Sequence, residues 1–143
     1  MLKSVLKSSI ITIFVICTSV ASANHDPRLQ KVLDARSDET KARDQYRHPK
    51  ETLHLLSIQE GMTVVDALPG SWYGDIITPL IGEKGTYIGV NYGEWFYENR
   101  FPDDAENRWE KAQAWLSEWP EEASQYGGGK NSPDIAAYFF PGL

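Results

Sequence analysis

The stretch from residue 63 to residue 74 constrains the fold most, because it joins a strand pattern, a glycine turn and the start of a helix. Three β-branched residues at 63–65 lead toward a Pro-Gly pair at 69–70, and residues 75–81 are rich in isoleucine and leucine. This order predicts a buried strand, a turn and a short helix. Asp66 lies near the end of the strand, where open α/β sheets bind their ligands.

The N-terminus has the pattern of a secretory signal peptide. Lys3 and Lys7 precede an apolar run at 10–20, and Ala21-Ser22-Ala23 is a small-residue cleavage site. We therefore expect residues 1–23 to be a signal peptide cleaved after Ala23, and the protein to be exported, to the periplasm, without stable membrane insertion. A retained membrane anchor is the alternative, although the run is short for a spanning helix. A lipoprotein site at Cys17 would need a residue smaller than isoleucine before it.

Composition narrows the partners and the chemistry. Cleavage would leave 143 − 23 = 120 residues without cysteine, so packing alone must hold the fold. Loss of the two leader lysines changes the formal charge from −6 to −8, and the absence of a basic patch argues against nucleic acid as a partner. The three histidines lack metal-ligand spacing, so no metal site is expected.

Helical patterns occupy residues 24–60, ahead of the first strand. Asp26 is suited to cap a helix over 27–35. Ser37 offers a second cap, ahead of the charge-rich segment 38–47, which predicts a solvated helix. Pro49 suits the first turn of a further helix that Gly61 ends. We expect that helix to bury a stripe consisting of Leu53, Leu55, Leu56 and Ile58.

Beyond the first turn, the pattern predicts a parallel β-α-β unit. The helix over 75–81 should be kinked or shortened by Pro79, and residues 86–91 read as a second strand. A helix beginning at Asp103 or Asp104, with Ala105, Trp109, Ala112 and Leu116 on one face, should stop at Pro120. The glycine-rich segment 125–133 reads as an exposed loop, and residues 134–140 as a third strand.

The segment from Tyr92 to Asp103 reads as a long loop with many aromatic residues: Trp95, Phe96, Tyr97 and Phe101. Two interpretations stay open. The rings can cover the edge of the sheet as ordinary core filler, or they can cap a bound ligand.

Two motifs together resemble a known family. Tyr-Arg-His-Pro-x-Glu-Thr-Leu spans 46–53, and Gly-Met-Thr-Val-Val-Asp-Ala-Leu-Pro-Gly spans 61–70, followed by Trp-Tyr at 72–73. The pattern is similar to that of the exported predicted class I S-adenosylmethionine-dependent methyltransferases, over roughly residues 44–143. The resemblance implies an α/β, Rossmann-like parallel sheet in residues 61–143, S-adenosyl-L-methionine as the cofactor and methyl transfer as the reaction. It implies no particular methyl acceptor and no catalytic residue.

The resemblance also assigns positions around the cofactor. Asp66 would anchor its amino-acid end, Gly70 would let backbone pass beside it, and Tyr73 and Gly74 would complete the turn. Asn91 stands at the position that usually grips the ribose hydroxyls through a carboxylate, and an amide can bond hydroxyls as well. The remaining candidates are Tyr92, against the adenine, and Tyr46 and Arg47, at the carboxylate end.

The chain departs from the family pattern in ways that matter for function. Trp72 stands where the pattern has its third glycine, the turn is one residue shorter, and an indole there would fill the cofactor site. Class I methyltransferases have seven strands, so we expect a partial domain with N-terminal helices and an unfinished sheet edge available for self-association. The alternative function is a non-catalytic exported module that binds a small molecule or a protein.

Overall fold

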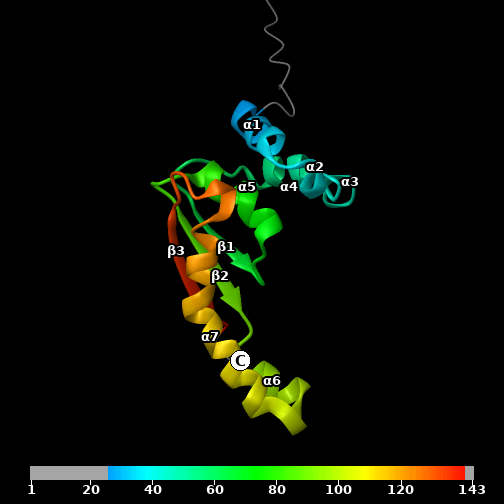
Figure 1. The fold of residues 1–143 in the computed structure, drawn as a ribbon, viewed down its shortest axis with the longest axis vertical. Helices are drawn as coiled ribbons and strands as arrows, with labels where there is room; N and C mark the ends of the chain where they lie inside the picture. Colours follow the sequence, from blue (N-terminus) through cyan, green and yellow to red (C-terminus); the bar gives the residue numbers. More distant parts are fainter. Residues whose placement is uncertain (1–25, 141–143) are drawn as a thin grey trace, which may run out of the picture.

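The computed structural model describes residues 26–140, and Figure 1 shows how their helices and strands are arranged. The expected signal peptide and its cleavage after Ala23 lie outside the described residues. None of the helices within 26–140 combines the length and the apolar character needed to cross a membrane. The elements in order are α1 (Pro27–Ala35), α2 (Asp38–Lys41), α3 (Asp44–Arg47), α4 (Pro49–Leu56), β1 (Thr63–Ala67), α5 (Ser71–Ile81), β2 (Thr86–Asn91), α6 (Glu94–Arg100), η1 (Pro102–Asp104), α7 (Ala105–Ala123), η2 (Tyr126–Gly128) and β3 (Asp134–Phe139).

The chain folds as an α/β unit around a three-stranded parallel sheet. The strand order is β1-β2-β3, and the register aligns Val65 with Ile88 and Ile88 with Ala136. The predicted parallel β-α-β unit and the predicted third strand are confirmed. This arrangement is compatible with a Rossmann-like fold.

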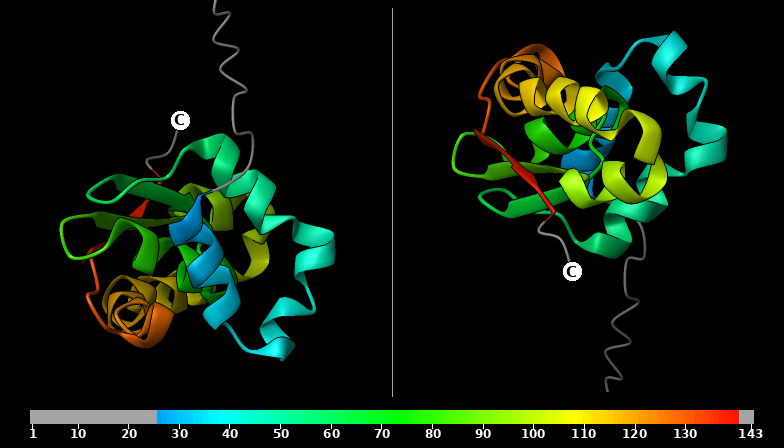
Figure 2. Two further views of the ribbon diagram at one scale, coloured as in Figure 1. Left: turned by 90° about the horizontal axis from the view of Figure 1, so that it is seen from above. Right: turned by 90° about the horizontal axis from the view of Figure 1, so that it is seen from below.

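Both crossovers lie on the same face of the sheet. They advance in the same direction, from β1 to β2 to β3, and right-handed crossovers then place α5 and α7 on one side. Figure 2 shows α7 running along that face. Val65 and Tyr138 occupy the other face and are 61% and 57% exposed. The prediction of a buried first strand is therefore wrong, because β1 is an edge strand whose outer face no described helix covers.

The hydrophobic core lies between the sheet and its helices. Its centre is Tyr87 of β2, which is fully buried and whose ring centroid lies 5.6 Å from that of Trp119 on α7. Gly89 permits this approach, because a Cβ there would lie 2.6 Å from the Trp119 ring. The isoleucines and leucine expected in the helix after the turn are all buried: Ile76, Ile77, Leu80 and Ile81.

The N-terminal helices begin where their caps predict, but they differ in length and burial. Asp26 caps α1 through the N–H groups of Arg28 and Leu29, and Ser37 caps α2. The single solvated helix expected over 38–47 is two short helices. In α4 only Pro49 and Leu53 are buried, one turn apart. The helix ends at Leu56 and not at Gly61, and the core contacts only the side of α4 that carries Pro49 and Leu53. Leu55 and Leu56 lie within α4 but are 83% and 60% exposed, so this part of the expected stripe is wrong, whereas Ile58 packs against the core.

Four further expectations are corrected in the second half of the chain. The aromatic loop contains the helix α6, which lies beyond the carboxyl ends of the strands (Figure 1). Pro120 lies inside α7 and does not end it. Proline has no N–H, so the carbonyl of Leu116 loses its helical donor, but Leu116 is in an exposed part of the helix where water can bind that carbonyl. Trp115 and Trp119 replace Leu116 on the inner face of α7. The loop after α7 holds Tyr126, which is buried and not exposed.

Candidate functional site

A cavity of about 430 Å³ lies at the carboxyl end of β1, next to the first turn of α5. It brings together four of the residues expected to bind the cofactor, Asp66, Gly70, Tyr73 and Arg47. Of its other members, Trp72 was expected here as a side chain that fills the site, whereas no sequence pattern indicated Arg43. The complete lining is Arg43, Arg47, Asp66, Ala67, Leu68, Gly70, Ser71, Trp72 and Tyr73.

The turn between β1 and α5 shapes the floor of the cavity. Leu68 takes a left-handed conformation with φ of 59°, and its N–H donates to the carbonyl of Val90 at 2.8 Å. Gly70 is the residue before α5, and its extended backbone has open space where a side chain would be. Since no side chain caps this end, the first N–H groups of α5 remain available to a ligand. A helix start of this kind favours a negatively charged group.

Asp66 provides the carboxylate of the cavity and is held from beneath. Its Oδ2 atom accepts a hydrogen bond from the buried Tyr87 hydroxyl at 2.7 Å. Its Oδ1 atom accepts none within residues 26–140 and remains accessible to solvent. Burial, together with the hydrogen bond to Asp66, raises the pKa of Tyr87, so this tyrosine stays a neutral donor. The contact fixes the carboxylate with one oxygen turned to solvent.

Arg47 lies opposite, on the N-terminal helices. Its guanidinium carbon is 4.9 Å from the centroid of the Trp72 ring and 5.9 Å from that of Tyr73. The Tyr73 hydroxyl donates to the Arg47 carbonyl at 3.3 Å, and Trp72 Nε1 donates to the Thr40 carbonyl at 3.1 Å. Trp72 therefore fastens the N-terminal helices to α5 and leaves a cavity beside itself, where the sequence predicted a filled site.

The other four expected residues do not line this cavity. Gly74 faces the opposite way, because a Cβ there would lie 2.3 Å from Cδ2 of Tyr126. Asn91 uses its side-chain oxygen to accept the N–H of Tyr92 at 2.8 Å. The Tyr92 ring stacks on Phe96 with centroids 3.8 Å apart. Tyr46 is 79% exposed.

The aromatic residues of α6 pack largely on one another and on α7. Phe96 has edge contacts with Tyr97 and Phe101, and Tyr97 lies 6.0 Å from Trp109. Trp109 in turn lies 4.6 Å from Phe139 of β3. These contacts describe the covering role that the sequence offered as one of its two interpretations.

The cavity combines opposite charges over a short span. Asp66 supplies an acceptor, while Arg43, Arg47 and the start of α5 supply positive potential and donors. A zwitterionic α-amino-acid group matches this arrangement, with its ammonium at the carboxylate and its carboxylate at the arginines. Within residues 26–140, no three His, Cys, Asp or Glu side chains are grouped as metal ligands. Comparisons with protein families, with curated proteins and with solved structures find no match for this chain.

Proposed function

We propose that the cavity at the carboxyl end of β1 binds S-adenosyl-L-methionine, and that the chain is a class I methyltransferase-like protein. The observation that supports this most is the shared cavity of Asp66 with Arg43, Arg47 and the start of α5. In the proposed complex Asp66 Oδ1 accepts from the ligand ammonium. The two arginines and the free N–H groups of α5 bind its carboxylate.

The rings beside Arg47 suit the rest of the ligand. Trp72 and Tyr73 line the cavity in an edge-to-face pair with centroids 4.7 Å apart. The guanidinium groups of Arg36 and Arg47 already lie over the Trp72 ring, so Tyr73 is the ring that would attract a cation such as a sulfonium. The adenosine would extend toward the end of β2, which neighbours β1 in the sheet and carries Asn91 and Tyr92. The ligand would supply an activated methyl group, and the protein would orient it and shield it from water.

Calorimetric titration tests the proposal through the two charges. Asp66→Asn and Arg47→Met should each weaken adenosylmethionine binding by about tenfold to a hundredfold, because each removes a charge-assisted hydrogen bond of roughly 1.5–3 kcal/mol. Arg100→Met is the matched control, because Arg100 lies in α6 against Phe101. Absence of binding by the unaltered protein, or equal loss in the control, would contradict the proposal.

A non-catalytic binding module is the second candidate, and one observation favours it. The groups that suit an amino-acid moiety line the cavity, whereas Asn91 and Tyr92 are engaged with neighbouring backbone and rings. A module of this kind would bind methionine about as tightly as adenosylmethionine. Titration with methionine, adenosylmethionine and adenosylhomocysteine separates the two functions, since a methyltransferase should prefer the two nucleosides.

A further inference from the structure

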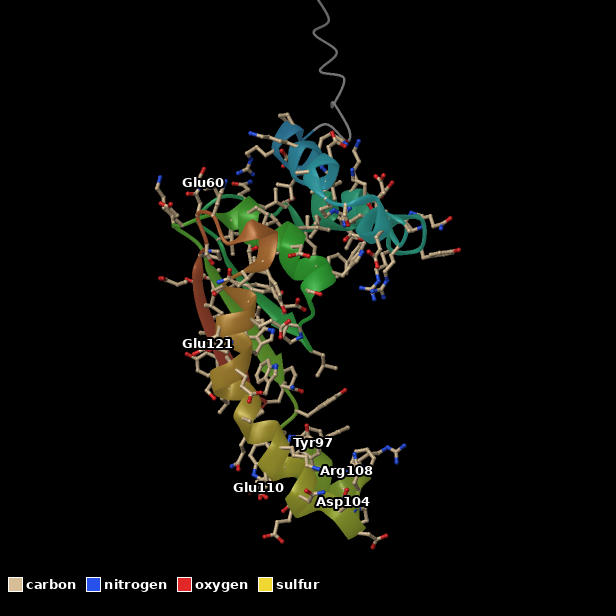
Figure 3. The ribbon with its side chains drawn as sticks, viewed as in Figure 1. Glu60, Tyr97, Asp104, Arg108, Glu110 and Glu121 are labelled. Atoms are coloured by element: carbon tan, nitrogen blue, oxygen red, sulfur yellow. The ribbon has the colours of Figure 1, made fainter. Side chains whose placement is uncertain are left out.

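A second and larger hollow lies on the side of α5 away from the candidate site. This groove, of about 970 Å³, runs between α1, the C-terminal half of α5 and the η2 turn. It shares no lining residue with the cavity at β1. Figure 3 shows Glu60, which lines it, at the end of the molecule that carries α1, far from Tyr97 and Asp104.

The wall formed by α1 is basic and partly apolar. Leu29 and Leu33 of this helix are buried in the core, while Arg28, Lys31 and Val32 line the groove. Lys31 forms no ion pair within the described residues, and Arg28 has only a loose contact of 3.8 Å with Asp26. No carboxylate of α1 lines the groove, so this wall presents positive charge beside an apolar surface.

Arg36, just after α1, adds a buried cation with unused donors. Its side chain is 6% exposed and forms an ion pair with Asp44 through Nη2. Its Nε and Nη1 atoms are buried without a hydrogen-bond partner. Oδ1 of its partner Asp44 is buried without a hydrogen-bond partner as well, so the pair leaves both donors and an acceptor unused. Arg36 therefore adds its positive charge to this wall.

The acidic residues of the groove, Glu60, Asp75 and Glu83, are on the opposite wall. Asp75 Oδ1 accepts the N–H of Gly127 at 3.0 Å, and Glu60 has a loose contact of 3.7 Å with Lys84. Within the described residues, none of the three forms an ion pair with Arg28, Lys31 or Arg36. Pro79 and Leu80 continue the apolar floor from Val32.

We propose that this groove binds a small organic anion, with its carboxylate or phosphate group at the α1 wall and its apolar body on the floor. Arg28 and Lys31 bind the anion, and the Arg36 guanidinium adds positive charge behind them. The size of the groove falls in the range typical of small-molecule sites. This site is independent of the cavity at β1 and of the function proposed for it.

Calorimetry and NMR titration of the folded protein test the site with phenyl phosphate, benzoate and, as an uncharged ligand of similar shape, benzyl alcohol. Both anions should bind at least about fivefold more tightly than benzyl alcohol, and the tighter of the two identifies the preferred anionic group. Lys31→Glu should weaken anion binding by about fivefold or more, and Arg28→Glu should act likewise. Both side chains lie at the surface, so these variants should keep their thermal stability.

Two controls separate this proposal from alternatives. Lys111→Glu makes the same charge reversal on an exposed face of α7 and should leave binding unchanged. Arg47→Met, in the cavity at β1, should leave the NMR shifts that phenyl phosphate causes in the groove residues unchanged, so anion binding in the cavity at β1 is told apart from binding in the groove. Equal binding of benzyl alcohol and the anions, no binding of either anion, or indifference to Lys31→Glu would each overturn the proposal. A loss of the groove shifts in Arg47→Met would overturn it too.

Discussion

Substitution of Gly74 by alanine should destabilise the protein, although alanine is the better helix former. In an unhindered helix the change would stabilise by about 0.5–1 kcal/mol. Here the new Cβ would lie 2.3 Å from Cδ2 and 2.6 Å from Cε2 of Tyr126. That ring is 6% exposed, and its hydroxyl is held by Glu122 at 2.8 Å, so it cannot move freely. Overpacking of this kind costs about 1–3 kcal/mol.

The difference between these ranges is a net loss of up to about 2.5 kcal/mol, and their midpoints give about 1 kcal/mol, or a fall of roughly 5 °C in the midpoint of thermal unfolding. Urea and thermal denaturation measure it, with Gly70→Ala as the matched control, because a Cβ at Gly70 meets nothing within 4 Å. In a Tyr126→Leu background the penalty of Gly74→Ala should largely disappear, which a double-mutant cycle detects. A stabilised Gly74→Ala protein, or an unchanged penalty in that background, would refute the reasoning.

Three other changes probe the turn and the carboxylate. Leu68→Gly should stabilise the protein by about 0.5–1 kcal/mol in urea unfolding, because relief of the left-handed strain at Leu68 outweighs the added entropy of the unfolded chain. A clear loss of stability would show that the backbone at Leu68 is not strained. Gly70→Ser should stabilise the protein by a few tenths of a kcal/mol, because the serine hydroxyl caps α5. The same hydroxyl occupies the free N–H groups of α5, so calorimetry should show severalfold weaker binding of adenosylmethionine. Unchanged affinity would place the ligand elsewhere. Burial and the hydrogen bond to Asp66 hold the pKa of Tyr87 above the ordinary tyrosine value of 10.0, so the unfolded chain ionises first. Wild-type stability should therefore be intact below about pH 10 and fall as the pH rises above it. Tyr87→Phe should lose about 1.5–3 kcal/mol at pH 7 and show a shallower alkaline decline in urea midpoints; an equally steep decline would assign the effect to other tyrosines.

The sequence predicted those parts of the fold that local patterns determine. The strand beginning at Thr63, the glycine turn and the apolar helix after it carry their signals within a few residues, and so do the caps Asp26 and Ser37. Parallel pairing followed from the β-α-β order alone. The four residues that meet in the cavity were all proposed from the resemblance, and the structure adds the contacts between them.

Features that depend on distant contacts could not be predicted in this way. Whether β1 is central or at an edge depends on which strands and helices exist elsewhere, and its own residues suit either place. The many aromatic residues after Tyr92 show no clear alternation of apolar and polar positions, so the sequence did not indicate the helix α6. Pro120 reads as a helix stop, but solvent near Leu116 makes it tolerable. Gly74 looked like part of a ligand turn because its neighbour Tyr126 lies far along the sequence.

The stacked indoles of α7 give the protein an optical signature. The ring centroids of Trp115 and Trp119 are 5.3 Å apart with planes 28° from parallel, close enough for their electronic transitions to couple. Trp119 also contacts Tyr87, and Trp115 lies 6.0 Å from Phe139. Circular dichroism in the indole bands should therefore report how α7 lies against the sheet, without any added label. Loss of that band before the loss of helical signal would show that the sheet releases α7 before the helix itself unwinds.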